Sequence, residues 1–369
     1  MENLKICIVS DSFKGGGVQR VAVNLANRYA SQGYEIILVI MKGKQDNNEI
    51  AKNVKVISLN LSRIRLGIFK LASIFRSEKP NSILSVSPST NVVVGLAHYF
   101  YSVPHLIFRE PNLLDEIFAK GYWESLLYIK AMQLTYARAS VIIANSKDTK
   151  QNLIKNKITN DEKIKVIPNP VVTVNLQSKK VNDCNHSWLI NNNYKVVISV
   201  GRLTRQKNHS LLIKAFAKVK VEIKNAKLII LGNGDLKKYL LNLSKSFGLE
   251  EDIDFVKYQD NPYPFYKEAD VFVLSSIYEG FGNVIVEALA CGTPVISTNC
   301  PGGPKDILEN GKYGKLVPVD DVDAMAEAII STLTQVDEHD ATSLRIQRSQ
   351  DFSVEKIAND YLCYLTNSI

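Results

Sequence analysis

Short apolar runs rich in β-branched residues alternate with longer helical stretches along most of the chain. Stretches that are expected to be helical, such as 18–32, 123–138 and 146–156, separate these runs. Strands that alternate with helices indicate βαβ units and a parallel sheet. The strands expected in the first half are 5–10, 35–40, 54–58, 82–86, 105–109, 141–145 and 165–167.

The alternation stops in a polar stretch without sustained period and then starts again. We therefore predict two doubly wound α/β domains: an N-terminal domain over 1–170, a linker over 171–194, and a C-terminal domain over 195–351. An amphipathic helix is expected within 352–369. The strands expected in the second half are 196–201, 227–232, 254–256, 271–274, 294–297 and 314–317.

Length and cysteine usage agree with a two-domain cytoplasmic protein. The chain has 369 residues, more than one hydrophobic core usually serves. No run approaches the length of a membrane span, and the N-terminus reads as a strand rather than a signal peptide. Its five cysteines are odd in number and lack C-x-x-C spacing, which favours reduced thiols and argues against a zinc site.

Charge is unevenly distributed between the two halves. Residues 1–170 hold 23 Lys and Arg against 13 Asp and Glu, a net +10, whereas the remainder holds 22 against 24, a net −2. The basic half therefore favours an anionic partner. No basic stripe interleaved with aromatic residues indicates nucleic acid, so a membrane surface or a phosphorylated acceptor fits better.

The segment 279–287 carries the clearest candidate chemistry. Glu279 and Glu287 flank a Gly-Phe-Gly-Asn turn that follows an apolar strand and opens a helix. Free backbone N–H groups and the helix dipole at such a junction favour an anion. A phosphate-bearing ligand with hydroxyls to be hydrogen-bonded, such as a nucleotide sugar, would use both features.

Two further loops offer cationic or glycine-rich chemistry. Arg202 and Lys207 follow the first strand of the second half and suit a diphosphate, although a solvated basic loop is the alternative. Gly15, Gly16 and Gly17 sit between a strand and a helix that carries Arg20 in its first turn, and a plain flexible turn is the alternative there. The glycines of 231–235 are interpreted as a simple turn.

Four segments together resemble glycosyltransferase family 4, whose members are retaining enzymes of the two-domain GT-B fold. The resemblance covers nearly the whole chain, and it implies two Rossmann-like domains that face a central cleft, with the C-terminal helix crossing back to the N-domain. The segments, in the order of the family's motifs, are 15–21, 200–208, 268–276 and 279–298.

The resemblance also implies donor-binding roles. Glu287 would hold the ribose hydroxyls and Glu279 the hydroxyls of the transferred sugar. Arg202 and Lys207 would neutralise the leaving diphosphate. Backbone groups of Gly280, Phe281, Gly282 and Asn283 would meet the sugar and diphosphate, Lys257 and Tyr258 the base, and Gly16, Gly17 and Arg20 the acceptor side.

One stretch departs from the family pattern. Where the family commonly has a histidine near the reacting carbon, this chain reads Phe-Arg-Glu-Pro-Asn, which is similar to a variant found in some bacterial hexosamine and galactose transferases. Arg109 or Glu110 is expected to take the place of the histidine, with Asn112 on the acceptor side. Asp306 also stands where the family often has glutamate.

The implied reaction needs neither a protein nucleophile nor a cofactor. The acceptor hydroxyl would attack from the face that the diphosphate leaves, and the leaving phosphate would take its proton. No D-x-D metal motif follows a strand, so Arg202 and Lys207 are expected to replace a metal ion. The expected partners are a nucleotide sugar, with UDP favoured, and a glycan or polyprenyl-diphosphate-linked acceptor.

Segment 61–79 raises the question of membrane contact. It carries five basic residues and one acid, and Leu66, Phe69 and Ile74 fall outside its main apolar stripe. Such a helix can lie in an anionic membrane interface, or it can pack on the N-domain sheet with solvated cations.

Two other functions share parts of this pattern. A UDP-sugar 2-epimerase has the same fold, but it needs additional acids and a histidine near the donor carbon that are not evident here. A non-catalytic subunit that binds nucleotide or glycan lipid is the second alternative. Neither explains the joint presence of Arg202, Lys207, Glu279 and Glu287 as well as a transferase does.

Overall fold

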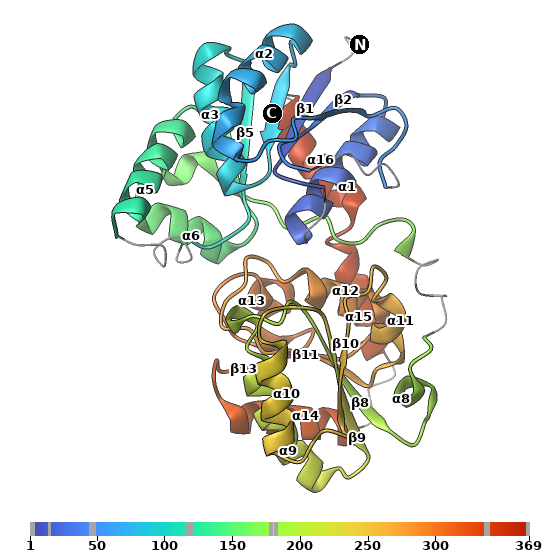
Figure 1. Ribbon diagram of the computed structural model, residues 1–369. Coiled ribbons are helices and arrows are strands. Elements are labelled where there is room, and N and C mark those ends of the chain that lie inside the picture. The colour runs from blue at the N-terminus through green and yellow to red at the C-terminus, as the bar shows by residue number, and fades with distance from the viewer. Residues whose placement is uncertain are drawn as a thin grey trace. The chain divides into compact units, whose positions relative to one another are not determined.

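The structure of the protein is a computed structural model that describes residues 4–13, 16–43, 49–114, 122–176, 180, 184–335 and 340–366. The chain divides into two compact units (Figure 1). Unit 1 comprises residues 1–173 together with 353–369, and unit 2 comprises residues 174–352. The division falls inside the stretch interpreted as a linker, which also contains the short helix α8 (Ser187–Ile190).

Unit 1 is built on a seven-stranded sheet in which every pairing is parallel. The strand order is β3-β2-β1-β4-β5-β6-β7, so the order reverses between β1 and β4. The central strands are almost fully buried, which explains their continuous apolar runs. The strands are β1 (Lys5–Ser10), β2 (Glu35–Ile40), β3 (Lys55–Ser58), β4 (Ser82–Ser85), β5 (His105–Glu110), β6 (Val141–Ala144) and β7 (Ile164–Val166).

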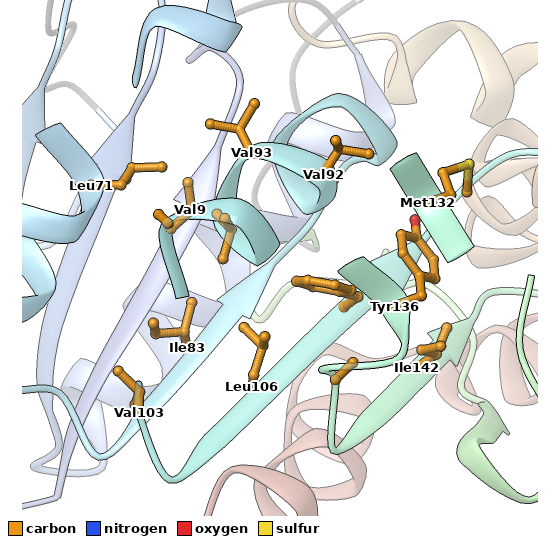
Figure 2. Packing of buried hydrophobic residues seen from close by; sticks show 14 of the residues in the cluster. Val9, Leu71, Ile83, Val92, Val93, Val103, Leu106, Met132, Tyr136 and Ile142 are labelled. Atoms are coloured by element: carbon orange, nitrogen blue, oxygen red, sulfur yellow. The ribbon is translucent and has the colours of Figure 1, made fainter. Parts of the chain in front are cut away.

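Helices cover both faces of this sheet. On one face α2, α3, α5 and α6 enclose a core that includes Phe75, Met132, Tyr136 and Leu153, part of which is drawn in Figure 2. On the other face lie α1 and α16. The helices of unit 1 are α1 (Gly17–Ser31), α2 (Ile68–Glu78), α3 (Pro88–Phe100), α5 (Tyr122–Tyr136), α6 (Lys147–Lys155) and α16 (Val354–Leu365), with the short 3₁₀ turns η1 (Ile64–Gly67) and η2 (Asp161–Lys163).

The last helix of the chain packs on the first unit. Ile357, Tyr361 and Leu365 are buried among residues of the β1–α1 region, and the Tyr29 hydroxyl donates to the Ala358 carbonyl at 2.9 Å. Each such side chain contributes about 1.5–3 kcal/mol through removal of apolar surface from water. The predicted return of the C-terminal helix to the N-domain is thus confirmed.

Unit 2 repeats the architecture with six parallel strands in the order β10-β9-β8-β11-β12-β13. The strands are β8 (Lys195–Val200), β9 (Ala226–Leu231), β10 (Ile253–Val256), β11 (Val271–Leu274), β12 (Val295–Thr298) and β13 (Lys315–Val317). The remaining helices are α9 (His209–Glu222), α10 (Lys237–Ser246), α11 (Tyr263–Glu268), α12 (Asn283–Cys291), α13 (Pro304–Ile307), α14 (Val322–Thr334) and α15 (Ala341–Gln350), with η3 (Arg205–Lys207) and η4 (Glu309–Gly311).

The prediction of two doubly wound parallel sheets is therefore confirmed, and each expected strand is present with ends that differ by at most one residue. Among the described helices, none has the length and hydropathy needed to cross a bilayer.

Candidate functional site

The candidate site of unit 2 lies where the order of its strands reverses. Strands β8 and β11 are neighbours, and the chain leaves them in opposite directions across the sheet. The loops that follow the carboxyl ends of these two strands lie at the point where open α/β sheets generally bind ligands. The loop after β8 carries Arg202 and Lys207, and the loop after β11 carries Glu279.

Lys207 and Glu279 form a largely buried ion pair. The Lys207 Nζ lies 2.5 Å from Glu279 Oε1, and the Ser276 hydroxyl donates to the same oxygen at 2.6 Å. The aliphatic part of Lys207 lies against Gly201, so a side chain at that position would crowd it. His209 is buried beside this loop. Its burial lowers its pKa to about 3, and the positive charge of Lys207 adds a smaller effect in the same direction. The pair therefore joins the two loops that the strand reversal brings together.

Arg202 occupies a different environment from Lys207. It follows β8 directly and is exposed. Its guanidinium forms no hydrogen bond or ion pair with any residue in the described part of the chain. An exposed, unpaired guanidinium at the end of a strand has its five N–H donors available for an anion such as a diphosphate.

Glu287 is held inside helix α12. Its side chain is only 3% exposed and accepts a hydrogen bond from the Tyr266 hydroxyl at 3.1 Å. Gly282 caps the helix in the left-handed region (φ 103°), and Asn283 is the first helical residue. The buried ring of Phe281 packs on Phe352 with centroids 5.6 Å apart. Gly280 lies between Glu279 and the buried Phe281, so the whole turn is tightly positioned.

Glycines allow four loops to meet around this turn. A Cβ on Gly302 would lie 1.9 Å from the Glu279 carbonyl oxygen, and one on Gly303 would lie 2.1 Å from that of Phe281. On the other side, a Cβ on Gly232 would lie 1.9 Å from the carbonyl oxygen of Gly201. The glycines of 231–235, interpreted from sequence as a simple turn, thus let the loop after β9 pack against the loop that carries Arg202.

Lys257 and Tyr258 lie at the same edge of the sheet, one strand further out. They follow β10, which β9 separates from β8, and both side chains are exposed. The structure therefore places them near the carboxyl ends of the strands, but away from the Lys207–Glu279 pair.

Unit 1 contains a pocket of about 500 Å³ at the carboxyl ends of β1, β4 and β5. It also lies where the strand order reverses, between β1 and β4. Three carboxylates, several hydroxyl and amide groups and five apolar side chains give it the mixed lining that suits a sugar. The residues that line it are Asp11, Val18, Gln19, Ser87, Pro88, Ser89, Glu110, Pro111, Asn112, Leu113, Leu114, Glu124, Ser125 and Tyr128.

Glu110 is the buried carboxyl of this pocket. It accepts a hydrogen bond from the Tyr136 hydroxyl at 2.7 Å, and the Asn91 amide donates in turn to that hydroxyl at 2.9 Å. Burial raises the pKa of Glu110 to about 7, against the opposing effects of the Tyr136 hydroxyl, the backbone N–H of Asn112 and the charge of Arg109. A carboxyl with this pKa changes its protonation state near neutral pH, as acid–base groups in active sites often do.

Arg109 is not brought to the same place. Neighbouring residues of a strand point to opposite faces, and the guanidinium of Arg109 is fully buried on the α16 side of the sheet. It donates to the Val86 carbonyl at 3.1 Å and to the Asn169 side chain at 2.6 Å. Burial lowers its pKa, and the Tyr361 hydroxyl opposes this effect. Of the two predicted catalytic residues of unit 1, only Glu110 lines the pocket.

The acceptor-side glycines lie next to this pocket. Gly16 precedes α1 with φ 147°, Gly17 begins the helix, and Arg20 is exposed in its first turn. Gly15 lies outside the described residues. Asn112 lines the pocket, as do Val18 and Gln19 of the same helix.

Sequence reasoning missed several residues of this region. Asp11 follows β1 directly, and that position at a strand end could have indicated it; its carboxylate accepts from the Gln19 amide at 3.0 Å. Tyr128 and Tyr136 carried no such signal, because only the packing of α5 on the sheet brings them to Glu110.

Two family models match this chain. The model described as Glycosyltransferase Family 4 matches residues 15–174, and the model described as Glycosyl transferases group 1 matches residues 183–346. Together they account for most of the chain, one on each side of the boundary between the two units.

Curated proteins similar to this chain along its length include two bacterial transferases. One is the N-acetylgalactosamine-N,N'-diacetylbacillosaminyl-diphospho-undecaprenol 4-alpha-N-acetylgalactosaminyltransferase of Campylobacter jejuni, 28% identical over 98% of this chain and 99% of that protein. The other is the lipopolysaccharide core biosynthesis glycosyltransferase LpsE of Rhizobium meliloti, also 28% identical, over 96% of this chain and 97% of that protein.

Among solved structures, Alr3699/HepE of Anabaena in complex with UDP and glucose superposes with a TM-score of 0.79. The two sequences are 22% identical, and the superposition covers 99% of this chain and 100% of that one. A glycosyltransferase from Rickettsia africae superposes with a TM-score of 0.82 at 20% identity, over 100% and 99% of the two chains. At these identities the superpositions show a common fold.

Proposed function

Because this chain belongs to glycosyltransferase family 4, we propose that it transfers a sugar, with retention, from a UDP-sugar to a glycan or polyprenyl-diphosphate-linked acceptor in bacterial polysaccharide assembly. The observation that carries this proposal is the Lys207–Glu279 pair where the strand order reverses, with Arg202 unpaired beside it and Glu287 buried in the following helix. These groups suit the diphosphate, the sugar and the ribose of one donor.

The donor end of the reaction follows from the charges in unit 2. Arg202 and Lys207 stabilise the negative charge that develops on the departing diphosphate. Glu279, already bonded to Lys207 and Ser276, has its second carboxylate oxygen available for a hydroxyl of the sugar. Glu287 binds the ribose hydroxyls, while Lys257 and Tyr258 border the base.

We propose that the acceptor attacks the anomeric carbon on the face that the diphosphate leaves. The bond between the acceptor oxygen and the anomeric carbon forms as the carbon–phosphate oxygen bond breaks, and the acceptor proton passes to the leaving phosphate. The name of the Campylobacter relative specifies an α-linked product, which would be retention if the donor sugar is α-linked. That name also supports a hexosamine donor, and galactose remains within the proposal.

The pocket of unit 1 is proposed to hold the acceptor sugar. Glu110 would orient its attacking hydroxyl as a hydrogen-bond acceptor, with Asn112 beside it. Names of relatives that act on undecaprenol-diphosphate-linked glycans support an acceptor of this chemistry.

This function is tested by incubating the protein with UDP-sugars and a panel of water-soluble glycan acceptors and measuring the release of UDP. We expect release that depends on both donor and acceptor, and NMR of the product should show the anomeric configuration of the donor. Acceptor-independent conversion of the UDP-sugar into its 2-epimer would identify an epimerase. Nucleotide binding without turnover would identify a non-catalytic partner.

We propose that the positive charge of Arg202 and Lys207 replaces a divalent metal ion, and that no other cofactor takes part. Transfer by the purified protein should therefore persist, within about twofold, after treatment with EDTA. Loss of transfer with EDTA and recovery with Mg²⁺ or Mn²⁺ would contradict metal independence without contradicting sugar transfer.

For its location, we propose the inner face of the plasma membrane, with segment 61–79 in contact with anionic lipid. Arg63, Arg65 and Lys70 are exposed on this segment. Replacement of all three by Glu should weaken binding to anionic vesicles by about tenfold or more. A control with the same change in charge is Glu at Lys224, Lys238 and Lys245 of unit 2, which should bind as the unmodified protein does. Equal binding of both triple variants would remove this role.

A further inference from the structure

Helix α5 presents a row of large apolar side chains to solvent. Trp123, Leu127 and Leu134 are 73%, 71% and 54% exposed. With Lys130 they recur at helical spacing, so they lie along one face of the helix. The opposite face buries Met132 and Tyr136 in the core against the sheet. The helix is thus apolar both toward the core and toward solvent.

The apolar row continues over two neighbouring helices. Figure 1 shows α2, α3 and α5 side by side on the same face of the sheet of unit 1, and their residues share one core. Phe69, in the first turn of α2, contacts Phe100 at the end of α3 with ring centroids 5.1 Å apart. Arg138, just beyond α5, lies 4.5 Å above the ring of Tyr99. We define the α2–α5 surface as the exposed side chains of Leu66, Phe69, Tyr99, Phe100, Trp123, Leu127 and Leu134.

Positive charge surrounds this surface. Exposed cations lie on these helices or directly beside them, and the following form no ion pair with a residue among those described: Arg63, Arg65, Lys70, Lys130 and Arg138. Of the two acids on these elements, Glu78 is already paired with Lys55 at 2.8 Å and Glu124 lines the pocket of unit 1.

Large apolar side chains exposed together on packed neighbouring helices are uncommon on a soluble monomer and mark an interaction site. Its composition selects the partner. Tryptophan, tyrosine and phenylalanine interspersed with unpaired arginine and lysine match the interface of an anionic bilayer, where rings enter the headgroup region and cations meet lipid phosphates. A protein partner would instead favour a surface depleted in lysine.

We propose that the α2–α5 surface docks on an anionic lipid bilayer, with α5 as its main contact and segment 61–79 as its flank. The role that we assign to this docking, which is to bring a lipid-linked acceptor to the pocket, rests on the proposed function. Glu124, Ser125 and Tyr128 of α5 line the pocket, so the helix that enters the interface also borders the proposed acceptor site. A polyprenyl-linked acceptor would then reach the pocket without leaving the membrane.

The two tryptophans of the chain allow a direct test. Trp188 lies in unit 2, so the variant Trp188→Phe keeps Trp123 as the single tryptophan. With vesicles that contain phosphatidylglycerol, its fluorescence should shift to the blue and be quenched by brominated lipid; pure phosphatidylcholine should give a smaller change. An unchanged spectrum with both vesicles would overturn the proposal.

A pair of matched variants separates docking from catalysis. Trp123→Ser with Leu127→Ser should weaken vesicle binding by about tenfold or more, because apolar area drives interfacial insertion. The control Tyr239→Ser with Leu241→Ser, also exposed but on α10 of unit 2, should bind as the unmodified protein does.

Transfer to a water-soluble acceptor should be retained by both variants. Equal vesicle binding by both would overturn the docking surface. If the unmodified protein binds vesicles but transfers no sugar, the proposed function fails and the docking surface stands. A second copy of the chain is the other possible occupant of this surface, and light scattering without lipid tests for it. Self-association that the Trp123 and Leu127 changes abolish would assign the surface to a second copy and contradict lipid docking.

Discussion

At the scale of single residues, Arg109 and Glu110 show how one strand serves two environments. Both are fully buried at the end of β5, but they face opposite sides of the sheet. Arg109 is held by backbone and amide oxygens that keep it within the fold. Glu110 has a hydroxyl donor on one oxygen and a pocket on its other side, so it is the group available to a ligand.

The raised pKa of Glu110 leads to a prediction about catalysis. If its carboxylate orients the acceptor, kcat/KM for the acceptor should rise with pH through a limb near pH 7. The Glu110→Gln variant should lack this limb and transfer more slowly by about 10²-fold. A pH profile measured with a soluble acceptor checks this, and an unchanged limb in the variant would assign it to another group.

The same shift makes a prediction about stability. The folded pKa of about 7 lies above the ordinary value of 4.5, so the native state favours the protonated form. The resulting stabilisation is complete below the unfolded pKa and is lost as pH rises through about 7. Between about pH 5 and pH 8, Glu110→Gln should therefore gain stability relative to the unmodified protein by up to about 3 kcal/mol. Urea unfolding at several pH values measures this difference, and a constant difference would contradict the raised pKa.

Glu287 allows a separate test of donor binding. Loss of its charge should weaken bonds to the ribose, each worth about 1.5–3 kcal/mol when one partner is charged. Glu287→Gln should accordingly raise the KM for the UDP-sugar by about 10- to 100-fold, whereas Glu327→Gln, an exposed change on α14, should leave it unaltered. Titration of UDP and UDP-sugar by calorimetry distinguishes lost affinity from lost turnover.

At the scale of elements, the donor site depends on how closely its loops approach. The loop after β12 touches the backbone of the 279–281 turn, and only glycine fits at Gly302 and Gly303. The loop after β9 touches the loop after β8 in the same way through Gly232 and Gly234. These contacts hold the Lys207–Glu279 pair at a fixed separation, which transition-state stabilisation requires.

A matched pair of glycine substitutions tests this role. Gly302 and Gly311 both have positive φ, at 121° and 103°, but only at Gly302 would a Cβ collide with backbone. Gly311→Ala should lower the stability by about 1 kcal/mol from strain alone. Gly302→Ala should lower the stability by about 2–4 kcal/mol and should also weaken donor binding. Urea unfolding and UDP binding measure the two effects. Equal costs for both variants would show that the loop contact is unimportant.

At the scale of the whole molecule, the two ends of the chain meet in unit 1. Helix α16 supplies part of the core beneath α1, and the Arg28–Glu355 pair at 2.8 Å adds a surface contact. Its Tyr361 also lies beside the buried Arg109, so the last helix supports the strand that ends in Glu110. Folding of the proposed acceptor domain thus requires a helix that follows the whole of unit 2 in the sequence.

Truncation of one buried ring in α16 should show this dependence. Tyr361→Ala removes a fully buried side chain and should destabilise unit 1 by about 3–5 kcal/mol. Cys363→Ala, on the exposed face of the same helix, should change stability by less than about 0.5 kcal/mol. Denaturant unfolding followed by Trp123 fluorescence in the Trp188→Phe background reports on unit 1, and equal stability of the two variants would contradict the role of α16.

Local pattern predicted much of this architecture. The apolar runs that became β1, β8 and β11 were recognisable because buried parallel strands need continuous apolar sequence, and the alternation with helices implied the parallel order. The donor residues were also recognisable, since Arg202, Lys207 and Glu279 lie in the loops that follow strand ends and such ends converge at one edge. Their roles in binding a donor stay predictions.

The tertiary structure alone decided the environments of these residues. Sequence placed Arg109 and Glu110 together as candidates, but strand alternation and the packing of α5 and α16 send one into the core and the other to a pocket. The sequence showed that 61–79 is basic and apolar, and only the fold joined it to the exposed row on α5. The physical reason is that periodicity and propensity are properties of neighbours in the chain. Burial, pKa and shared surfaces depend on groups far apart in sequence that packing brings into contact.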